Sequence, residues 1–109
     1  MRKINIGPEN TEGICSCVEE CAEKMLILSD PTRLRIIRVL LKTPLNVGEI
    51  SDLTSLDIKR ISHHLGIMKL SGLVEAKKEG RTRVYRISSK ISSGTGIDLG
   101  CCKINFRPL

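Results

Sequence analysis

The fold of this chain is decided by residues 46–73, NVGEISDLTSLDIKRISHHLGIMKLSGL, which predict two short helices joined by a tight turn. Asn46 can cap the first helix, while the Glu49 side chain can return a hydrogen bond to the Asn46 amide in a capping box. Asp57 can cap the second helix, because its carboxylate can accept hydrogen bonds from the free amides of the first turn. The stretch therefore predicts a helix-turn-helix.

The second helix, expected over Asp57–Leu70, has an apolar side and a polar, basic side. Its apolar residues recur at steps of three and four, and with Ile50 and Leu53 of the first helix they are expected to be buried: Ile58, Ile61, Leu65 and Met68. The rest of its circumference carries Lys59, Arg60, Ser62, His63, Gly66 and Lys69. Long cations suit phosphates and short polar groups suit base edges. This helix is predicted to enter the DNA major groove; the alternative is a basic helix that is only solvated.

Composition places the positive charge in the middle of the chain. The 109 residues carry a net charge of +6, but residues 31–90 alone hold thirteen Lys or Arg against five acids. A basic centre suits a polyanionic partner. There is no apolar run of membrane-spanning length and no secretory signal, so we expect a cytoplasmic protein without a membrane partner. No Ser/His/Asp set, paired carboxylates or phosphate-cradling glycine loop is visible, so an enzyme is not expected.

The segments before this unit are predicted in order. Residues 1–14 have little pattern and are expected to form a flexible arm. A helix is expected from about Cys15 to Leu28, with one face marked by Ile14, Val18, Cys21, Met25 and Leu28. Ser29-Asp30-Pro31 stops that helix and starts the next, with Asp30 as its cap. The second of these helices, to about Lys42, is rich in Leu, Ile and Val and is expected at the domain centre.

A β-hairpin is predicted after the basic helix. Residues 73–77 read as a strand, residues 78–82 as a charged turn and residues 83–87 as the returning strand. Basic side chains gather where such a hairpin would touch a phosphate backbone or the minor groove: Lys77, Lys78, Arg81 and Arg83. The alternative is an ordinary solvated hairpin.

Five short motifs together resemble the ArsR/SmtB family of winged-helix, metal-sensing transcriptional repressors. They are SDPTRLRI (29–36), GEI (48–50), SHHL (62–65), SGLV (71–74) and GR (80–81). The resemblance covers about residues 15–88 and implies a homodimer that binds a twofold symmetric operator in double-stranded DNA and is released by an effector. It also implies that Ser62, His63 and His64 lie on the DNA-reading helix. His63 is expected to touch a base or phosphate, whereas His64 either joins it or is structural.

The sequence departs from the family in two places. Residues 47–53 hold no cysteine, so the thiolate metal site that some members have on this helix is absent. Residues 88–96, SSKISSGTG, read as a Ser/Gly-rich loop, so the usual last helix and its zinc ligands are missing. We expect a mainly α fold with a small β-hairpin (α+β): a winged helix-turn-helix over residues 15–88, and over 89–109 a C-terminal extended segment in place of the last helix.

Five cysteines gather at the two ends of the chain, and they are the candidate metal ligands: Cys15, Cys17, Cys21, Cys101 and Cys102. In a reducing compartment they favour metal or redox chemistry over structural disulfides. In a winged-helix dimer both ends would lie away from DNA and could meet within or across subunits. Thiolates suit soft ions such as Zn(II), Cd(II), Pb(II) and As(III). Cys21, on the apolar stripe, has core packing as its alternative.

The last residues alternate in two phases. Ile97, Leu99 and Cys101 share one parity, and Cys102, Ile104 and Phe106 share the other. Because one strand keeps one parity, a β-bulge at the cysteine pair is expected, which could aim both sulfurs at one site. The alternative is that the two thiols point to opposite faces.

Three functions compete. The first is a sequence-specific repressor released from its operator when thiolates coordinate a soft metal or metalloid. The second is a winged-helix repressor whose thiols sense oxidation or persulfide. The third is a winged-helix protein-interaction module with structural zinc.

Overall fold

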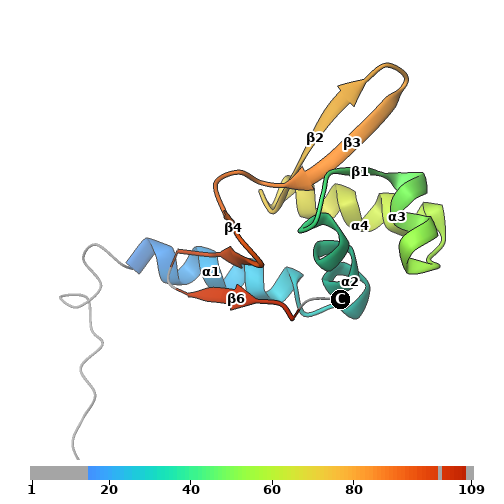
Figure 1. Ribbon diagram of the computed structural model, residues 1–109. Coiled ribbons are helices and arrows are strands. Elements are labelled where there is room, and N and C mark those ends of the chain that lie inside the picture. Colours follow the sequence, from blue (N-terminus) through green and yellow to red (C-terminus); the bar gives the residue numbers. More distant parts are fainter. Residues whose placement is uncertain (1–14, 101, 108–109) are drawn as a thin grey trace, which may run out of the picture.

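The computed structural model describes residues 15–100 and 102–107, and within them the chain is a mixed helix and sheet structure (Figure 1). The helices are α1 (Cys15–Ile27), α2 (Pro31–Leu40), α3 (Val47–Thr54) and α4 (Ile58–Leu70). The strands are β1 (Leu45–Asn46), β2 (Val74–Glu79), β3 (Thr82–Ile87), β4 (Ser92–Ser93), β5 (Gly96–Asp98) and β6 (Lys103–Asn105). The expected α+β winged helix-turn-helix is confirmed. The expected arm, residues 1–14, lies outside the described residues.

The helix boundaries are set by caps that were predicted from the sequence. The Asp30 carboxylate accepts hydrogen bonds from the backbone N–H of Thr32 at 2.8 Å and of Arg33 at 3.2 Å, with Pro31 in the first turn. At α3 the Asn46 side chain accepts from the Glu49 amide at 2.8 Å, and Glu49 accepts from the Asn46 amide at 2.9 Å. These contacts satisfy amides that a helix start leaves without partners.

The aliphatic core lies where the faces of α2, α3 and α4 meet. Ile36, Ile50 and Leu65 are fully buried, one from each helix. The burial prediction was wrong for Leu53 and Ile58, whose exposed fractions are 62% and 52%. Leu53 lies near the end of α3 and Ile58 begins α4, so the two residues flank the turn that joins these helices.

The first sheet contains the wing. Its strand order is β1-β3-β2, all antiparallel, and β2 and β3 form a hairpin that projects from the helices (Figure 1). Glu79 pairs with Thr82, so the turn is only Gly80-Arg81, with Gly80 at φ 63°. The predicted five-residue turn was too long, because a glycine at positive φ permits the two-residue turn that suits twisted strands. Strand β1 was not predicted.

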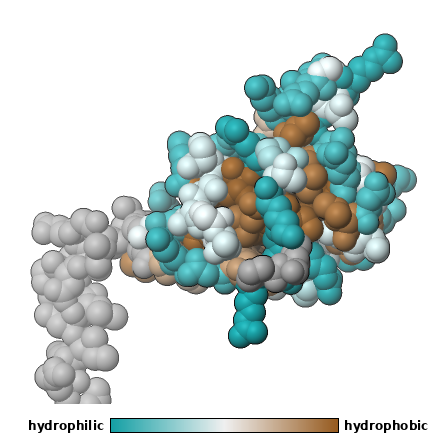
Figure 2. Space-filling model, viewed as in Figure 1, coloured by the Kyte–Doolittle hydropathy of each residue, from teal (hydrophilic) through white to brown (hydrophobic). Residues whose placement is uncertain are grey.

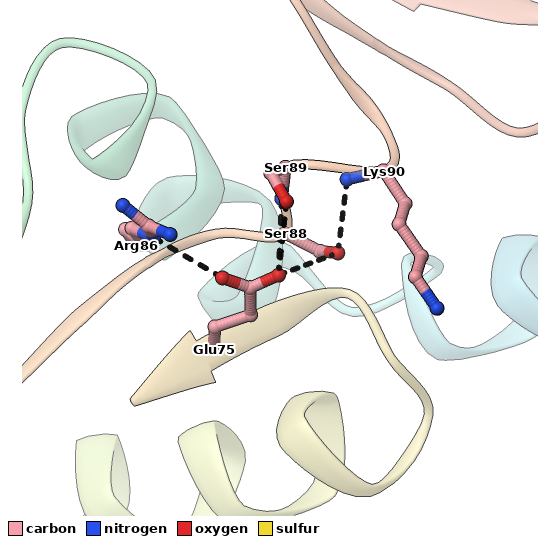
Figure 3. A network of polar contacts seen from close by, with 5 residues as sticks. All are labelled: Glu75, Arg86, Ser88, Ser89 and Lys90. Atoms are coloured by element: carbon pink, nitrogen blue, oxygen red, sulfur yellow. Dashed lines mark hydrogen bonds and ion pairs between the residues drawn. The ribbon is translucent and has the colours of Figure 1, made fainter. Parts of the chain in front are cut away.

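A cluster of polar contacts fixes the point where the wing joins the C-terminal segment (Figure 3). One Glu75 carboxylate oxygen accepts from Arg86 Nε at 3.1 Å; the other accepts from the Ser88 hydroxyl at 3.2 Å and the Ser89 amide at 3.1 Å. The Ser89 amide and Arg86 lower the pKa of Glu75, outweighing its partial desolvation. The carboxylate therefore holds the exit of β3 in place.

The C-terminal segment is a second antiparallel sheet, of order β4-β5-β6, rather than a helix. The extended segment was therefore predicted correctly, but two details were wrong. Residues 88–96 are not all loop, because Ser93 pairs with Gly96 across a tight turn. The phase changes at residues 99–102 because the chain reverses, not because of a bulge: the Leu99 amide donates to the Cys102 carbonyl at 2.9 Å, and Gly100 has φ 104°. Across the described ranges, no helix is both long and apolar enough to cross a membrane.

Candidate nucleic-acid interface

Helix α4 has one buried face and one exposed face. Ile61, Leu65 and Met68 are fully buried. The Asp57 carboxylate caps the helix by accepting from the amides of Lys59 at 3.0 Å and Arg60 at 3.2 Å. All six polar and small residues predicted for the other side are exposed: Lys59, Arg60, Ser62, His63, Gly66 and Lys69. The helix thus presents cations, a hydroxyl and an imidazole to any duplex laid against it.

Gly66 leaves a gap in the side chains of this exposed face. A Cβ at this position would meet nothing within 4 Å, so packing inside the described chain does not account for the glycine. Gly66→Ala is therefore expected to raise the free energy of unfolding by about 0.5–1 kcal/mol through helix propensity. If the backbone at Gly66 approaches DNA, the same change weakens duplex binding. Urea denaturation and fluorescence anisotropy measure the two effects; unchanged duplex affinity would remove Gly66 from the interface.

His64 does not share the exposure of His63. Its side chain is only 9% exposed, and its Nδ1 accepts a hydrogen bond from Arg33 Nε at 3.0 Å. Burial lowers the pKa of His64, against an opposing effect of the Asp30 carboxylate. These observations favour the structural alternative for His64 over contact with DNA. Arg33 was missed by sequence reasoning, because its partner is 31 residues away and no local pattern links them.

The wing offers a second set of cations. Lys77, Lys78, Arg81 and Arg83 are all exposed, and Figure 2 shows the projecting hairpin as a hydrophilic arm. Lys78 and Arg83 are paired across the two strands, and Arg81 lies in the turn at the tip. Among the residues described, the sole ion pair joins Glu75 and Arg86 near the base of the wing. The four cations are therefore without carboxylate partners there and are available to phosphates.

Arg81→Ala is expected to weaken binding to all duplexes alike and to reduce the slope of log affinity against log salt by about 1, because one phosphate contact is lost. His63→Ala should instead erode preference among bases, by about 1–3 kcal/mol at the contacted position. Salt titrations followed by fluorescence anisotropy measure both. Lys103→Ala, which removes an exposed cation from β6, is the matched control and should change neither. Unchanged affinity in both test variants would mean that DNA docks elsewhere.

The two cysteine-bearing ends meet within one chain. The buried Cys21 thiol of α1 donates to the Leu99 carbonyl at 2.7 Å, at the start of the turn that contains Cys102. Cys102 is half-buried and packs against the core. The side chains of Cys15 and Cys17, and all of Cys101, lie outside the described residues. In the part of the chain that can be described, no three potential ligands are gathered.

Similarity to known proteins agrees with this geometry. The profile of the family described as "Bacterial regulatory protein, arsR family" matches residues 30–76, from the α2 cap into the wing. The chain is 40% identical over 70 residues to the HTH-type transcriptional regulator MJ1325 of Methanocaldococcus jannaschii, covering 63% of this chain and 79% of that protein. It is 34% identical to the cadmium resistance transcriptional regulatory protein CadC of Listeria innocua, covering 74% and 66%.

A solved structure extends the match to the tertiary fold. It is the homodimeric winged helix-turn-helix DNA-binding domain of Mb0332 from Mycobacterium bovis, a possible ArsR-family regulator, with a TM-score of 0.60 and 25% identity over 80% of this chain and 78% of that one. These relatives are regulators, which agrees with the expectation that the chain is not an enzyme. The chain belongs to the ArsR family and is a transcriptional regulator with a DNA-binding winged helix-turn-helix.

Proposed function

We propose that this regulator is a homodimeric repressor that leaves its operator when cysteine thiolates bind a soft metal or metalloid ion. The observation that carries the proposal is the contact between the Cys21 thiol and the Leu99 carbonyl. It brings α1, the helix that carries Cys21, against the turn that carries Cys102. An ion held there would link α1 to the C-terminal sheet.

The donor set suits such an ion. Thiolates prefer Zn(II), Cd(II), Pb(II) or As(III) over hard cations. We propose Cys21 and Cys102 as ligands, because Cys21 contacts the turn that carries Cys102, and Cys15, Cys17 and Cys101 are the remaining candidates. The name of CadC connects that similar protein with cadmium resistance. In this chain the thiols near the two ends take the place of the metal site that some family members have on α3, since residues 47–53 contain no cysteine.

A homodimer is supported by the surface of α1. Val18, Met25 and Leu26 are 50%, 44% and 74% exposed, although they are apolar. Burying such side chains against a second copy would be favourable, at about 25 cal/mol for each Å² of apolar surface removed from water. The similar Mb0332 domain is homodimeric. Two copies of α4 would then read the two halves of a symmetric operator.

A thiol-redox repressor is the second candidate, and the same contact supports it. Oxidation of Cys21 with Cys101 or Cys102 would close a disulfide, with two protons and two electrons passing to an external oxidant. This reaction would also tie α1 to the C-terminal turn. The two candidates differ in what restores DNA binding: a chelator reverses metal coordination, and a thiol reductant reverses a disulfide.

Metal binding tests the proposal directly. Reduced protein is titrated with Cd(II), and thiolate-to-metal charge-transfer absorption is recorded together with elemental analysis. Wild-type protein should bind one cadmium ion at each site and show strong charge-transfer absorption. Cys21→Ala and Cys102→Ser should each weaken cadmium binding, because each removes a ligand. Ser16→Ala, beside Cys17, is the control that should bind normally. Equal cadmium binding by a variant without cysteines would overturn the proposal. If the protein binds no metal but loses the mass of two hydrogen atoms when it is oxidised, the redox candidate is favoured.

A further inference from the structure

Arg33 joins two helices that are far apart in the sequence. It lies half-buried in the first turn of α2. Its Nη1 donates to the carbonyl of Ile27, the last residue of α1, at 3.0 Å, and its Nε donates to Nδ1 of His64 in α4 at 3.0 Å. Because a guanidinium is planar and rigid, both contacts depend on one orientation of one group. The end of α1 and the middle of α4, the recognition helix predicted to enter the major groove, are therefore held by the same side chain.

The contact requires a neutral His64. A nitrogen that accepts a hydrogen bond has no proton, so the proton of the neutral ring must be on Nε2. The charged and titratable groups that act on His64 are Asp30 and Arg33 at the start of α2, and Arg60 and His63 on α4. Burial lowers the pKa of His64; Asp30 opposes this, while Arg33, His63 and Arg60 add to it.

We propose that Arg33 is a positioning residue for DNA binding, and that a proton on His64 Nδ1 breaks its hold on the recognition helix. The proton turns the acceptor into a donor that faces another donor, and it places an imidazolium against a guanidinium. The hydrogen bond is lost and replaced by repulsion. The helix is then no longer fixed to the end of α1, so duplex binding weakens as the pH falls. The inference rests on the DNA-binding part of the function and not on its metal part.

His63 complicates the measurement, because its ring lies 5.5 Å from that of His64 and is exposed on the face predicted to meet DNA. An imidazolium on that face would lie toward phosphates and would strengthen duplex binding. The two histidines therefore act with opposite signs. The His64 effect is isolated in a His63→Gln background.

The experiment compares His63→Gln with the double variant His63→Gln/His64→Gln. The glutamine amide oxygen can accept from Arg33 Nε but does not titrate near neutral pH. Affinity for an operator duplex selected from a random-sequence pool is measured by anisotropy from pH 7.5 to 5.5 at constant ionic strength. The single variant should lose affinity below the His64 pKa, by at most about tenfold per pH unit, the limit for one linked proton. The double variant should be flat.

A second readout does not depend on DNA. Nuclear magnetic resonance of the His64 ring gives its pKa, which should rise in Arg33→Gln because a neighbouring cation is removed, and should stay low in Arg33→Lys. Both Arg33 variants should weaken duplex binding at pH 7.5, since neither restores the two bonds. Equal pH dependence in the single and double histidine variants, or an unchanged pKa in Arg33→Gln, would overturn the inference. Absence of duplex binding at every pH would overturn DNA binding itself, whereas failure to respond to metal would leave this inference intact.

Discussion

Leu65→Ala is expected to lower the free energy of unfolding by about 2–5 kcal/mol, the cost of a cavity in a packed aliphatic core. Leu65 is fully buried on the inner face of α4. Domains of this size are stable by only about 5–15 kcal/mol, so the loss is a large part of the total. Urea denaturation followed by circular dichroism measures it.

Leu70→Ala in the same helix is the matched control, because Leu70 is 91% exposed and the chemical change is identical. It should stay within about 0.5 kcal/mol of wild type. Both variants are compared at one protein concentration, so that any dimer contributes equally. Similar losses in the two variants would mean that α4 packs with a different face inward, and the exposed face assigned to DNA would be wrong.

Gly96→Ala is expected to force apart strands β5 and β6 of the C-terminal sheet. A Cβ at Gly96 would collide with the Ile104 carbonyl oxygen and would lie 2.9 Å from the Asn105 Cα, both on the neighbouring strand β6. Overpacking of this kind costs about 1–3 kcal/mol. Since Ile97 beside it is fully buried, separating the strands would also expose part of the core.

Thermal denaturation should show the loss of stability, with Gly66→Ala as the control in which an added methyl meets open space. A more local readout is the rate at which a thiol reagent labels Cys21 in proteins that have serine at the other four cysteines. Labelling should accelerate in Gly96→Ala, because Leu99 no longer covers the Cys21 thiol. An unchanged labelling rate would mean that the sheet tolerates a side chain at Gly96 or does not cover α1.

The parts that could be predicted from sequence depend on local chemistry. Asn46 with Glu49, and Asp57 with the two amides that follow it, are helix starts in which donor and acceptor lie within three residues of each other. Their spacing alone therefore located α3 and α4, and the alternation after Gly72 located the wing. The resemblance to the family also predicts how α4 and the wing dock on DNA, which the pattern of one helix alone cannot indicate.

The parts that could not be predicted depend on partners far along the chain. Ser/Gly-rich composition predicts a loop at Gly96, whereas its strand is defined by pairing with Asn105. The two-phase pattern around Cys101 and Cys102 was interpreted as a bulge, although Gly100 between two short alternating segments is also a signal of a hairpin turn. Sequence alone leaves two roles open for His64, because the contact that decides between them comes from Arg33, 31 residues away.

Control of DNA binding by the cysteine thiolates is tested most directly on the protein–operator complex. The reduced complex is titrated with Cd(II) and followed by anisotropy, for wild type and for a variant in which all five cysteines are serine. A coupling of about 1–3 kcal/mol predicts that metal weakens wild-type binding by roughly 5- to 150-fold and leaves the cysteine-free variant on its operator. Equal release of both proteins would contradict thiolate control.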